Sequence, residues 1–231
     1  VEDIVLEPLS SSQAVLSPDE QEVGVVLVDI GGGTTDVTIY SEGSIVHTSV
    51  LALGGNHLTH DIAIGLGAPL REAEEIKHKF GVAMANMVEE NEMIDVPSVG
   101  GRNNRTMQKR VLASIIEDRF REIFELIAHE IEKTHFHTLM ASGVVITGGT
   151  CIMSGADRLA SQVLNLPVRV GYPENISGLR EMIYSPKYAT SVGLVRYGIT
   201  SNQGKLNFVG DDTNLFHKVS RRMKDWMQEF F

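Results

Sequence analysis

Two apolar runs that end in glycines constrain the fold of this chain more than any other feature. The run VGVVLV, residues 23–28, leads into DIGGGTTD, residues 29–36, and GVVITGG, residues 143–149, repeats the arrangement. Short β-branched runs of this kind are typical of buried strands. Glycines at a strand end let backbone N–H groups approach phosphate oxygens, because no Cβ stands in the way. One such turn is also what a tight hairpin needs, but two of them favour an anion-binding site.

The segments between and after the glycines predict layers of strands and helices. Alternation in TTDVTIY and in SIVHTSV, on either side of Glu42-Gly43, predicts a strand, a tight turn and a further strand. Helices are predicted for residues 57–67, 68–81, 106–134, 154–164 and 187–198, and a short strand for VRVG. The core-facing stripe of the third helix is predicted as Val111, Ile115, Ile116, Phe120, Ile123, Phe124, Ile127 and Ile131. Antiparallel strands followed by helices indicate an α/β or α+β fold.

Composition excludes several classes of protein. With 30 acidic and 20 basic residues among 231, the formal net charge is −10, so a general nucleic-acid binder is not expected. Cys151 is the single cysteine, which excludes an internal disulfide and indicates a reducing compartment. No apolar run approaches the roughly 20 residues that span a bilayer, and the acidic N-terminal residues do not resemble a signal peptide. Because the chain begins with Val1 and not Met, we expect a fragment of a longer protein.

Further residues extend the candidate binding site. Asp29 precedes the first glycines, where a carboxylate can hold a water of Mg²⁺, because this ion prefers oxygen ligands and keeps much of its hydration. Thr34 and Thr35 add hydroxyl donors. Glu74 and Lys77 lie one turn apart on a predicted helix. The P-loop, the HExxH motif of zinc proteases and the GxSxG nucleophile elbow are absent from the sequence.

A cluster of basic residues interrupts the acidic body of the chain. Its members are Arg102, Arg105, Lys109, Arg110, Arg119 and Arg121. Among them only Glu117 and Asp118 oppose the positive charge, so the cluster is a candidate dock for an acidic partner. The alternative is that these side chains form the solvated face of a helix.

The C-terminal residues differ from the body in pattern. Residues 199–214 lack periodicity and are predicted to form a linker. After it, apolar residues recur every three or four positions, at Leu215, Val219, Met223, Trp226, Met227 and Phe230, with basic Lys218, Arg221, Arg222 and Lys224 between them. A basic amphipathic helix with a tryptophan is typical of an interfacial membrane anchor, and residues 215–231 are predicted to be one. The alternative is a helix that packs on the body or on a partner.

The glycine segments resemble the phosphate and adenosine motifs of the superfamily of actin, DnaK-type chaperones and sugar kinases. Within it the chain is similar to the bacterial cell-division FtsA family, in VVLVDIGGGTTDVTIY, HDIAIGLGAP, AEEIKHKFG, VPSVGGR, VGYPENISGL and YATSVGLVRYG. The resemblance covers nearly all of residues 20–198. It implies an actin-like (ribonuclease H-like) α/β lobe over residues 1–198, with a mixed sheet flanked by helices. A second subdomain would be inserted at roughly 82–142, and a C-terminal amphipathic helix is also a family trait.

This resemblance implies an ATP-binding membrane tether that anchors FtsZ filaments and helps to recruit the divisome at the septum. The protein would self-associate into filaments and lie peripherally on an anionic membrane surface, at the cytoplasmic face of the cell membrane. ATP hydrolysis would be slow at most. Two other functions remain open: a sugar or acetate kinase of the same superfold, and another actin-like assembly protein.

The resemblance also assigns roles to individual residues. Asp29 would organise Mg²⁺ through water, and phosphates would be held by Gly31, Gly32, Gly33 and Thr34. Glu74 and Lys77 would contact ribose or adenine, and the adenosine pocket would be lined by Gly148 and Gly149. The basic cluster would receive the acidic C-terminal peptide of FtsZ. Family members carry an N-terminal half that this chain lacks, so we expect ATP binding and polymerisation to be weakened.

Overall fold

The computed structural model describes residues 3–98, 104–134, 140–174 and 180–206. They belong to two compact units, Val1–Leu194 and Val195–Phe231. The first unit contains the sheet, its covering helices and the candidate site. In the second unit, the described residues continue helix α8 (Ala189–Leu206).

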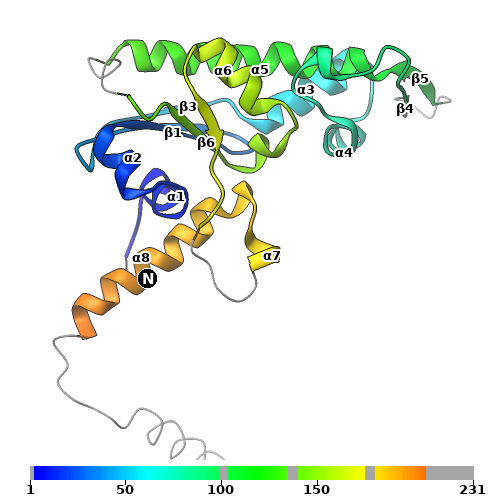
Figure 1. Cartoon of the computed structure of the whole chain (residues 1–231). Helices are drawn as coiled ribbons and strands as arrows, with labels where there is room; N and C mark the ends of the chain where they lie inside the picture. Colours follow the sequence, from blue (N-terminus) through cyan, green and yellow to red (C-terminus); the bar gives the residue numbers. More distant parts are fainter. Residues whose placement is uncertain (1–2, 99–103, 135–139, 175–179, 207–231) are drawn as a thin grey trace, which may run out of the picture. The chain divides into compact units, whose positions relative to one another are not determined.

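A five-stranded mixed sheet with the order β3-β2-β1-β6-β7 forms the centre of the first unit (Figure 1). Its strands are β1 (Val25–Ile30), β2 (Thr35–Ser41), β3 (Ser44–Leu51), β6 (Val144–Thr147) and β7 (Val168–Val170). The first three form the predicted antiparallel meander, and β6 and β7 continue the sheet in parallel with β1. The β2–β3 turn has positive φ angles of 50° at Glu42 and 73° at Gly43, as tight two-residue hairpins require.

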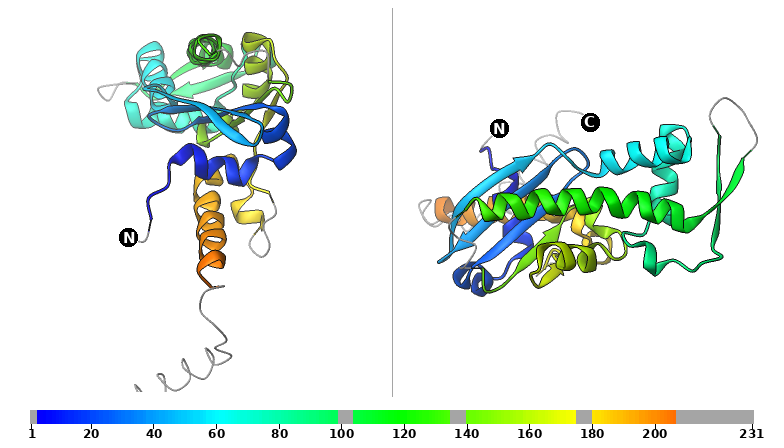
Figure 2. Two further views of the ribbon diagram at one scale, coloured as in Figure 1. Left: turned by 90° about the vertical axis from the view of Figure 1, so that its left-hand side faces the viewer. Right: turned by 90° about the horizontal axis from the view of Figure 1, so that it is seen from above.

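Helices cover both faces of this sheet. Helix α5 (Lys109–Glu132) crosses one face between α3 (Gly55–Leu66) and α6 (Ala156–Leu164), and α1 (Glu7–Val15) covers the other (Figure 2). The remaining helices of this unit are α2 (Pro18–Val23), α4 (Leu70–Phe80), α7 (Arg180–Ile183) and the 3₁₀ helices η1 (Ala85–Met87), η2 (Gly149–Ile152) and η3 (Pro186–Tyr188). A separate two-stranded sheet pairs β4 (Met93–Val96) with β5 (Arg105–Gln108).

The side chains of β1 alternate between two buried clusters. Val26, Val28 and Ile30 belong to the larger cluster, with residues of α3, α5 and α6. Val25 and Leu27 belong to the smaller cluster, with residues of α1. Because successive side chains of a strand point to opposite faces, this alternation directs Asp29 to the face that α1 covers.

Helices α1 and α2 have no counterpart among the predicted elements. The segment that forms α1, EPLSSSQAV, buries three consecutive serines instead of an apolar stripe. Their hydroxyls are satisfied by backbone carbonyls: Ser11 donates to Glu7 and Ser12 to Leu9. Helix α2 is short, and a capping box between Ser17 and Glu20 defines its start. Neither helix shows the 3.6-residue apolar period on which the sequence prediction depends.

The long helix α5 begins three residues later than predicted. Residues 106–108 belong to β5, which pairs with β4, so cross-strand pairing takes precedence over helical periodicity here. The predicted stripe is confirmed from Ile116 onward, but Val111 is 40% exposed and Leu112 is buried in its place. The helix is therefore rotated slightly at its start from the orientation that the apolar pattern predicts.

The predicted linker, residues 199–214, is wrong in its first half. Helix α8 continues to Leu206, so residues 199–206 are helical. Ile199, Thr200 and Ser201 are exposed, so no apolar stripe marks this part of the helix, and extending an existing helix needs no new nucleus. The rest of the predicted linker and the predicted membrane helix, residues 215–231, lie outside the described residues.

The predicted inserted subdomain, residues 82–142, has no core of its own among its described residues. Ile94 of β4 and Phe124 of α5 belong to the same buried cluster as Val28 of β1. The central part of α5 therefore packs with the helices and strands of the main lobe, and a boundary at residue 142 would cut through one core.

A glycine in α8 tests how closely two helices pack. A Cβ on Gly193 would overlap the carbonyl oxygen of Ser10 in α1, so Gly193→Ala is expected to lower the free energy of unfolding by about 1–3 kcal/mol. Gly198→Ala is the matched control in the same helix, because among the described residues no atom outside its own stretch of helix lies within 4 Å of its Cβ position. Helix propensity should make that control about 0.5–1 kcal/mol more stable. Urea unfolding would measure both, and equal effects would contradict the close packing.

Candidate functional site

The first glycine turn, residues 31–34, follows β1 and packs against the N-terminus of α3. The carbonyl oxygen of Gly31 accepts a hydrogen bond from Gly55 N–H at 2.9 Å, and that of Gly32 accepts one from Asn56 N–H at 2.7 Å. A Cβ on Gly54 would lie 2.7 Å from the Gly31 oxygen, so this close approach requires glycine. Both carbonyls of the turn therefore point toward α3.

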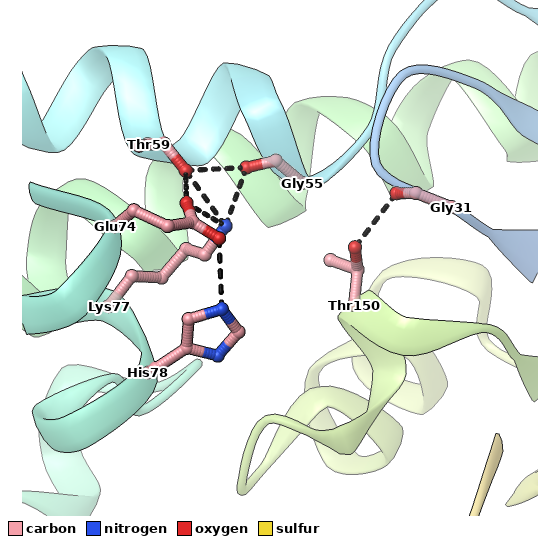
Figure 3. Close-up of polar contacts among 7 residues, drawn as sticks. All are labelled: Gly31, Gly55, Thr59, Glu74, Lys77, His78 and Thr150. Atoms are coloured by element: carbon pink, nitrogen blue, oxygen red, sulfur yellow. Dashed lines mark hydrogen bonds and ion pairs between the residues drawn. The ribbon is translucent and has the colours of Figure 1, made fainter. Parts of the chain in front are cut away.

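The second glycine turn follows β6 and lies beside the first, because β1 and β6 are adjacent and parallel. Gly148 has a φ of +92°, which favours glycine, and it packs against Ile30 and Asp29. Two residues later, the Thr150 hydroxyl donates a hydrogen bond of 2.8 Å to the carbonyl oxygen of Gly31 (Figure 3). The two predicted turns are thus joined at one carbonyl group.

Lys77 of α4 is buried, with 8% of its surface exposed. Its ammonium donates to the carbonyl oxygen of Gly55 at 3.0 Å and to Thr59 Oγ1 at 2.8 Å, and it pairs with Glu74 Oε2 at 2.8 Å (Figure 3). An ammonium has three N–H donors, and all of them are used by these protein acceptors. Lys77 therefore holds α3 and α4 together. A ligand contact was predicted for both Lys77 and Glu74, but Lys77 has no N–H donor left for it, so Glu74 is the residue of the two that is able to make it.

The Glu74 side chain keeps 39% of its surface exposed, and its Oε1 lies 2.9 Å from His78 Nε2. Partial burial acts to raise the pKa of Glu74. Hydrogen bonds from Lys77 and Thr59, together with the charges of Lys77 and His78, outweigh burial, so the pKa is lowered. Glu74 is therefore an anion at neutral pH, and its exposed edge can accept hydrogen bonds from hydroxyl groups.

These groups line a pocket of about 420 Å³. The lining residues are Gly32, Gly55, Asn56, Glu74, Lys77, His78, Gly81, Gly149, Thr150, Ile152, Met153, Ser154 and Lys187. Four of the predicted binding residues are among them: Gly32, Glu74, Lys77 and Gly149. Sequence reasoning missed the others. Gly55 and Asn56 lie just before the predicted helix of residues 57–67, His78 follows Glu74 at helical spacing, and Lys187 belongs to no motif.

The other predicted binding residues lie outside this lining. Gly33 and Thr34 are exposed in the first turn, and Gly31 forms its base. Thr35 is fully buried, and its hydroxyl donates to the carbonyl oxygen of Leu53 at 2.8 Å. The predicted role of the Thr35 hydroxyl as a ligand donor is therefore wrong, because Thr35 already belongs to β2. Gly148 is enclosed behind Gly149.

Asp29 lies at the end of β1 with 5% of its surface exposed. Burial raises the pKa of Asp29 to about 6, and the negative charges of Glu7 and Asp36 add to this effect. Thr190 Oγ1 donates to Asp29 Oδ2 at 3.4 Å. Glu7, in the first turn of α1, belongs to no sequence motif and was not predicted as a neighbour.

The fit of Mg²⁺ to this region depends on a single carboxylate. No three His, Cys, Asp or Glu side chains within the described ranges are arranged to hold a metal ion. Asp29 could therefore bind Mg²⁺ only through water or together with oxygens of a ligand, which is how this ion is often held. The negative charge of Glu7 and Asp36 nearby would be partly neutralised by such a cation.

Most of the predicted basic cluster is paired with carboxylates. The pairs are Lys109–Glu92 (2.7 Å), Arg110–Glu90 (3.8 Å), Arg121–Glu117 (3.2 Å), Arg119–Asp61 and Arg119–Glu122. Arg105 donates instead to the carbonyl oxygen of Leu66, at the end of α3. The prediction that only Glu117 and Asp118 oppose this cluster is wrong, because Asp61, Glu90 and Glu92 approach it from other segments.

Two predicted sets cannot be placed. Arg102 and the anchor residues, Leu215 to Phe230, lie outside the described residues. Among the helices that the structure describes, none has the length and apolar character needed to cross a bilayer.

The mixed sheet, its helical layers and the joined glycine turns define a protein of the actin-like class. The structure of MreB5 of Spiroplasma citri bound to ADP matches with a TM-score of 0.70 at 20% identity, over 88% of this chain and 62% of that one. The PilM–PilN type IV pilus biogenesis complex matches with a TM-score of 0.61 at 17% identity, over 86% of this chain and 53% of that one. These likenesses concern the fold and confirm the predicted actin-like lobe.

The chain belongs to the FtsA family. The family model "Cell division protein FtsA" matches residues 26–193. Cell division protein FtsA of Pseudomonas aeruginosa is 40% identical, and that of Escherichia coli K12 is 38% identical, each over 100% of this chain and 57% of its own length. The Neisseria meningitidis relative is 44% identical over 83% of this chain and 47% of its own length. The chain thus spans about half the length of these curated relatives.

Asp29→Asn is expected to change how stability depends on pH. The folded-state pKa of about 6 lies above the ordinary value of 3.8, so folding favours the protonated carboxyl, and this stabilisation is lost as the pH rises through about 6. At neutral pH the Asn variant should therefore unfold with a free energy up to about 3 kcal/mol higher than that of the wild type. The difference should shrink toward pH ~4.

Urea unfolding of both proteins across this pH range would measure the effect. Glu7→Gln removes one neighbouring negative charge, so it should reproduce a smaller part of the same pH dependence. A difference between Asp29→Asn and the wild type that stays constant with pH would show that the Asp29 pKa is not raised.

Proposed function

We propose that the pocket at the glycine turns binds ATP and forms one wall of a nucleotide cleft. The observation that carries this proposal is that Glu74 and residues of both glycine turns line one pocket. Exposed backbone N–H groups in a glycine turn suit phosphate oxygens. The Glu74 carboxylate suits the hydroxyl groups of a ribose. MreB5, whose fold this chain shares, is bound to ADP in its structure.

Mg²⁺ would accompany the phosphates. Asp29 is the residue that would hold it, through water, and the cation would supply charge neutralisation at the phosphates. We further propose that this chain alone binds ATP weakly, because the cleft of an actin-like protein closes between two lobes and the chain supplies the wall of one. Any ATP hydrolysis would be slow.

For the whole protein, we propose the role of an actin-like membrane tether in cell division. It would anchor FtsZ filaments to the cytoplasmic face of the membrane at the septum, associate with itself into filaments and help to recruit other divisome proteins. The support is membership of the FtsA family, whose relatives in Pseudomonas aeruginosa and Escherichia coli are cell division proteins. Because the chain covers 57% of the length of these relatives, this role is proposed for the whole protein and not for the chain alone.

Docking of the acidic C-terminal peptide of FtsZ is proposed for five residues of the basic cluster: Arg102, Arg105, Lys109, Arg110 and Arg119. Arg110 is the most available of its described members, because it lies 3.8 Å from Glu90, whose side chain is 86% exposed, and exposed pairs at this distance are weak. Arg119 is the least available. Hydrogen bonding to Asp61 raises the pKa of Arg119, and the charges of Asp61 and Glu122 add to this effect. An acidic peptide would have to compete with those carboxylates.

The first test of the nucleotide proposal replaces the acceptor of the pocket. Glu74→Gln keeps the shape of the side chain but removes its charge, so the affinity for ATP should fall about tenfold, the effect of losing a charge-assisted hydrogen bond. Glu75→Gln is the matched control, since Glu75 pairs with Arg71 and its side chain is 62% exposed. ATP would be titrated to millimolar concentration into the isotope-labelled chain, and amide NMR shifts would give the affinities. Equal affinities of the two variants would remove the support for a nucleotide at Glu74.

The second test concerns the proposed membrane anchor, residues 215–231. Trp226→Glu combined with Phe230→Glu places charges on the apolar side of the predicted helix, so binding to anionic liposomes should be lost while the body stays folded. A chain that ends at Asn214 should also stay in solution. Co-sedimentation with liposomes would measure all three proteins. If the double variant pelleted as fully as the wild type, the tail would not be the anchor.

A further inference from the structure

We infer that Thr150 is a positioning residue for the phosphate-binding turn. The inference rests on the proposed function, because it concerns how the first glycine turn presents N–H groups to the phosphates of a nucleotide. Thr150 lies in η2, after β6, and its hydroxyl donates to the carbonyl oxygen of Gly31, after β1 (Figure 3). This contact joins residues separated by 119 positions in the sequence.

Because the peptide group is planar, the hydrogen bond from Thr150 to the Gly31 carbonyl also sets the direction of the Gly32 N–H. In a planar trans peptide, the C=O of one residue and the N–H of the next point in opposite directions. The Gly31 carbonyl is held by the Thr150 hydroxyl and by Gly55 N–H, so the N–H of Gly32 must point away from both. The Gly32 carbonyl is held by Asn56 N–H, so the N–H of Gly33 points away from α3 in the same way.

A turn of three glycines needs such a restraint. Glycine populates both positive and negative φ readily, so an exposed glycine peptide that is held weakly can rotate and turn its N–H away. Gly32 and Gly33 are exposed, and no partner for their N–H groups is found among the described residues. A carbonyl oxygen has two lone pairs. Gly55 N–H occupies one of those on Gly31, and the Thr150 hydroxyl occupies the other.

The structure reserves space for the Thr150 hydroxyl. A Cβ on Gly55 would lie 2.6 Å from Thr150 Oγ1, so a larger residue at position 55 would displace the hydroxyl from Gly31. The carbonyl oxygen of Gly55 accepts a hydrogen bond of 3.0 Å from Lys77 Nζ. The glycine turn is therefore fixed from two sides, by Thr150 from η2 and by Lys77 through α3.

Two substitutions separate the hydroxyl from the shape of the side chain. Thr150→Val keeps the shape and removes the donor, whereas Thr150→Ser keeps the donor. The probes are ATP and adenosine, titrated separately into the isotope-labelled 231-residue chain and followed by amide NMR shifts. Thr150→Val should weaken ATP binding about fivefold, the usual effect of losing one neutral hydrogen bond. The affinity of the same variant for adenosine, which lacks phosphates, should fall less than about twofold. Thr150→Ser should restore the affinity for ATP.

The outcomes distinguish this inference from the proposal on which it rests. An equal loss for ATP and adenosine, or a Ser variant as weak as the Val variant, would overturn the role of Thr150 and leave the nucleotide pocket standing. A wild-type chain that bound neither probe at millimolar concentration would overturn both. If Thr150→Val did not fold, Thr150→Ala carries the same expectation. A purely structural role of Thr150 would lower stability without changing the ratio of the two affinities.

Discussion

The parallel pairing of β1 with β6 is the contact on which the candidate site depends. It places the ends of two strands side by side, so that glycine turns far apart in the sequence meet at the carbonyl group of Gly31. Hydrogen bonds from Gly55 N–H and the Thr150 hydroxyl then fix the Gly31 carbonyl group, and Gly55 is also the first residue of helix α3. A change in the register of β1 against β6 would separate the turns and remove the pocket wall between them.

Polar groups around the pocket are largely satisfied by one another. Lys77 uses all its donors within the protein, and Glu74 shares its carboxylate with Lys77, Thr59 and His78. Displacing water from such a network costs few hydrogen bonds, because its polar groups already bond to one another. The wall is therefore formed before any ligand arrives, and the groups left for recognition are the outer edge of Glu74 and the backbone of the glycine turn.

Strong local patterns allowed the sheet and part of the site to be predicted from the sequence. Residues close together in the sequence are enough to predict the β-branched strands, the Glu42-Gly43 turn and the glycine turns. Glu74 and Lys77 are likewise placed together by helical spacing. Contacts between distant segments could not be predicted in this way. The serines of α1, the pairing of β5 with β4, and the carboxylates that neutralise Lys109, Arg110 and Arg119 all depend on tertiary neighbours. The same is true of Lys187, which reaches the pocket from η3.

Helices α1 and α8 meet backbone to backbone where Gly193 faces the carbonyl of Ser10. The Ser10 hydroxyl also donates to the carbonyl oxygen of Thr190 at 2.7 Å, and Thr190 in turn donates to Asp29. Side chains between two helices can absorb a displacement by changing rotamer, but a direct backbone contact in a close-packed interior cannot. The start of α8 is therefore held closely against α1, and the hydrogen bonds through Thr190 extend this contact to the buried carboxyl group of Asp29.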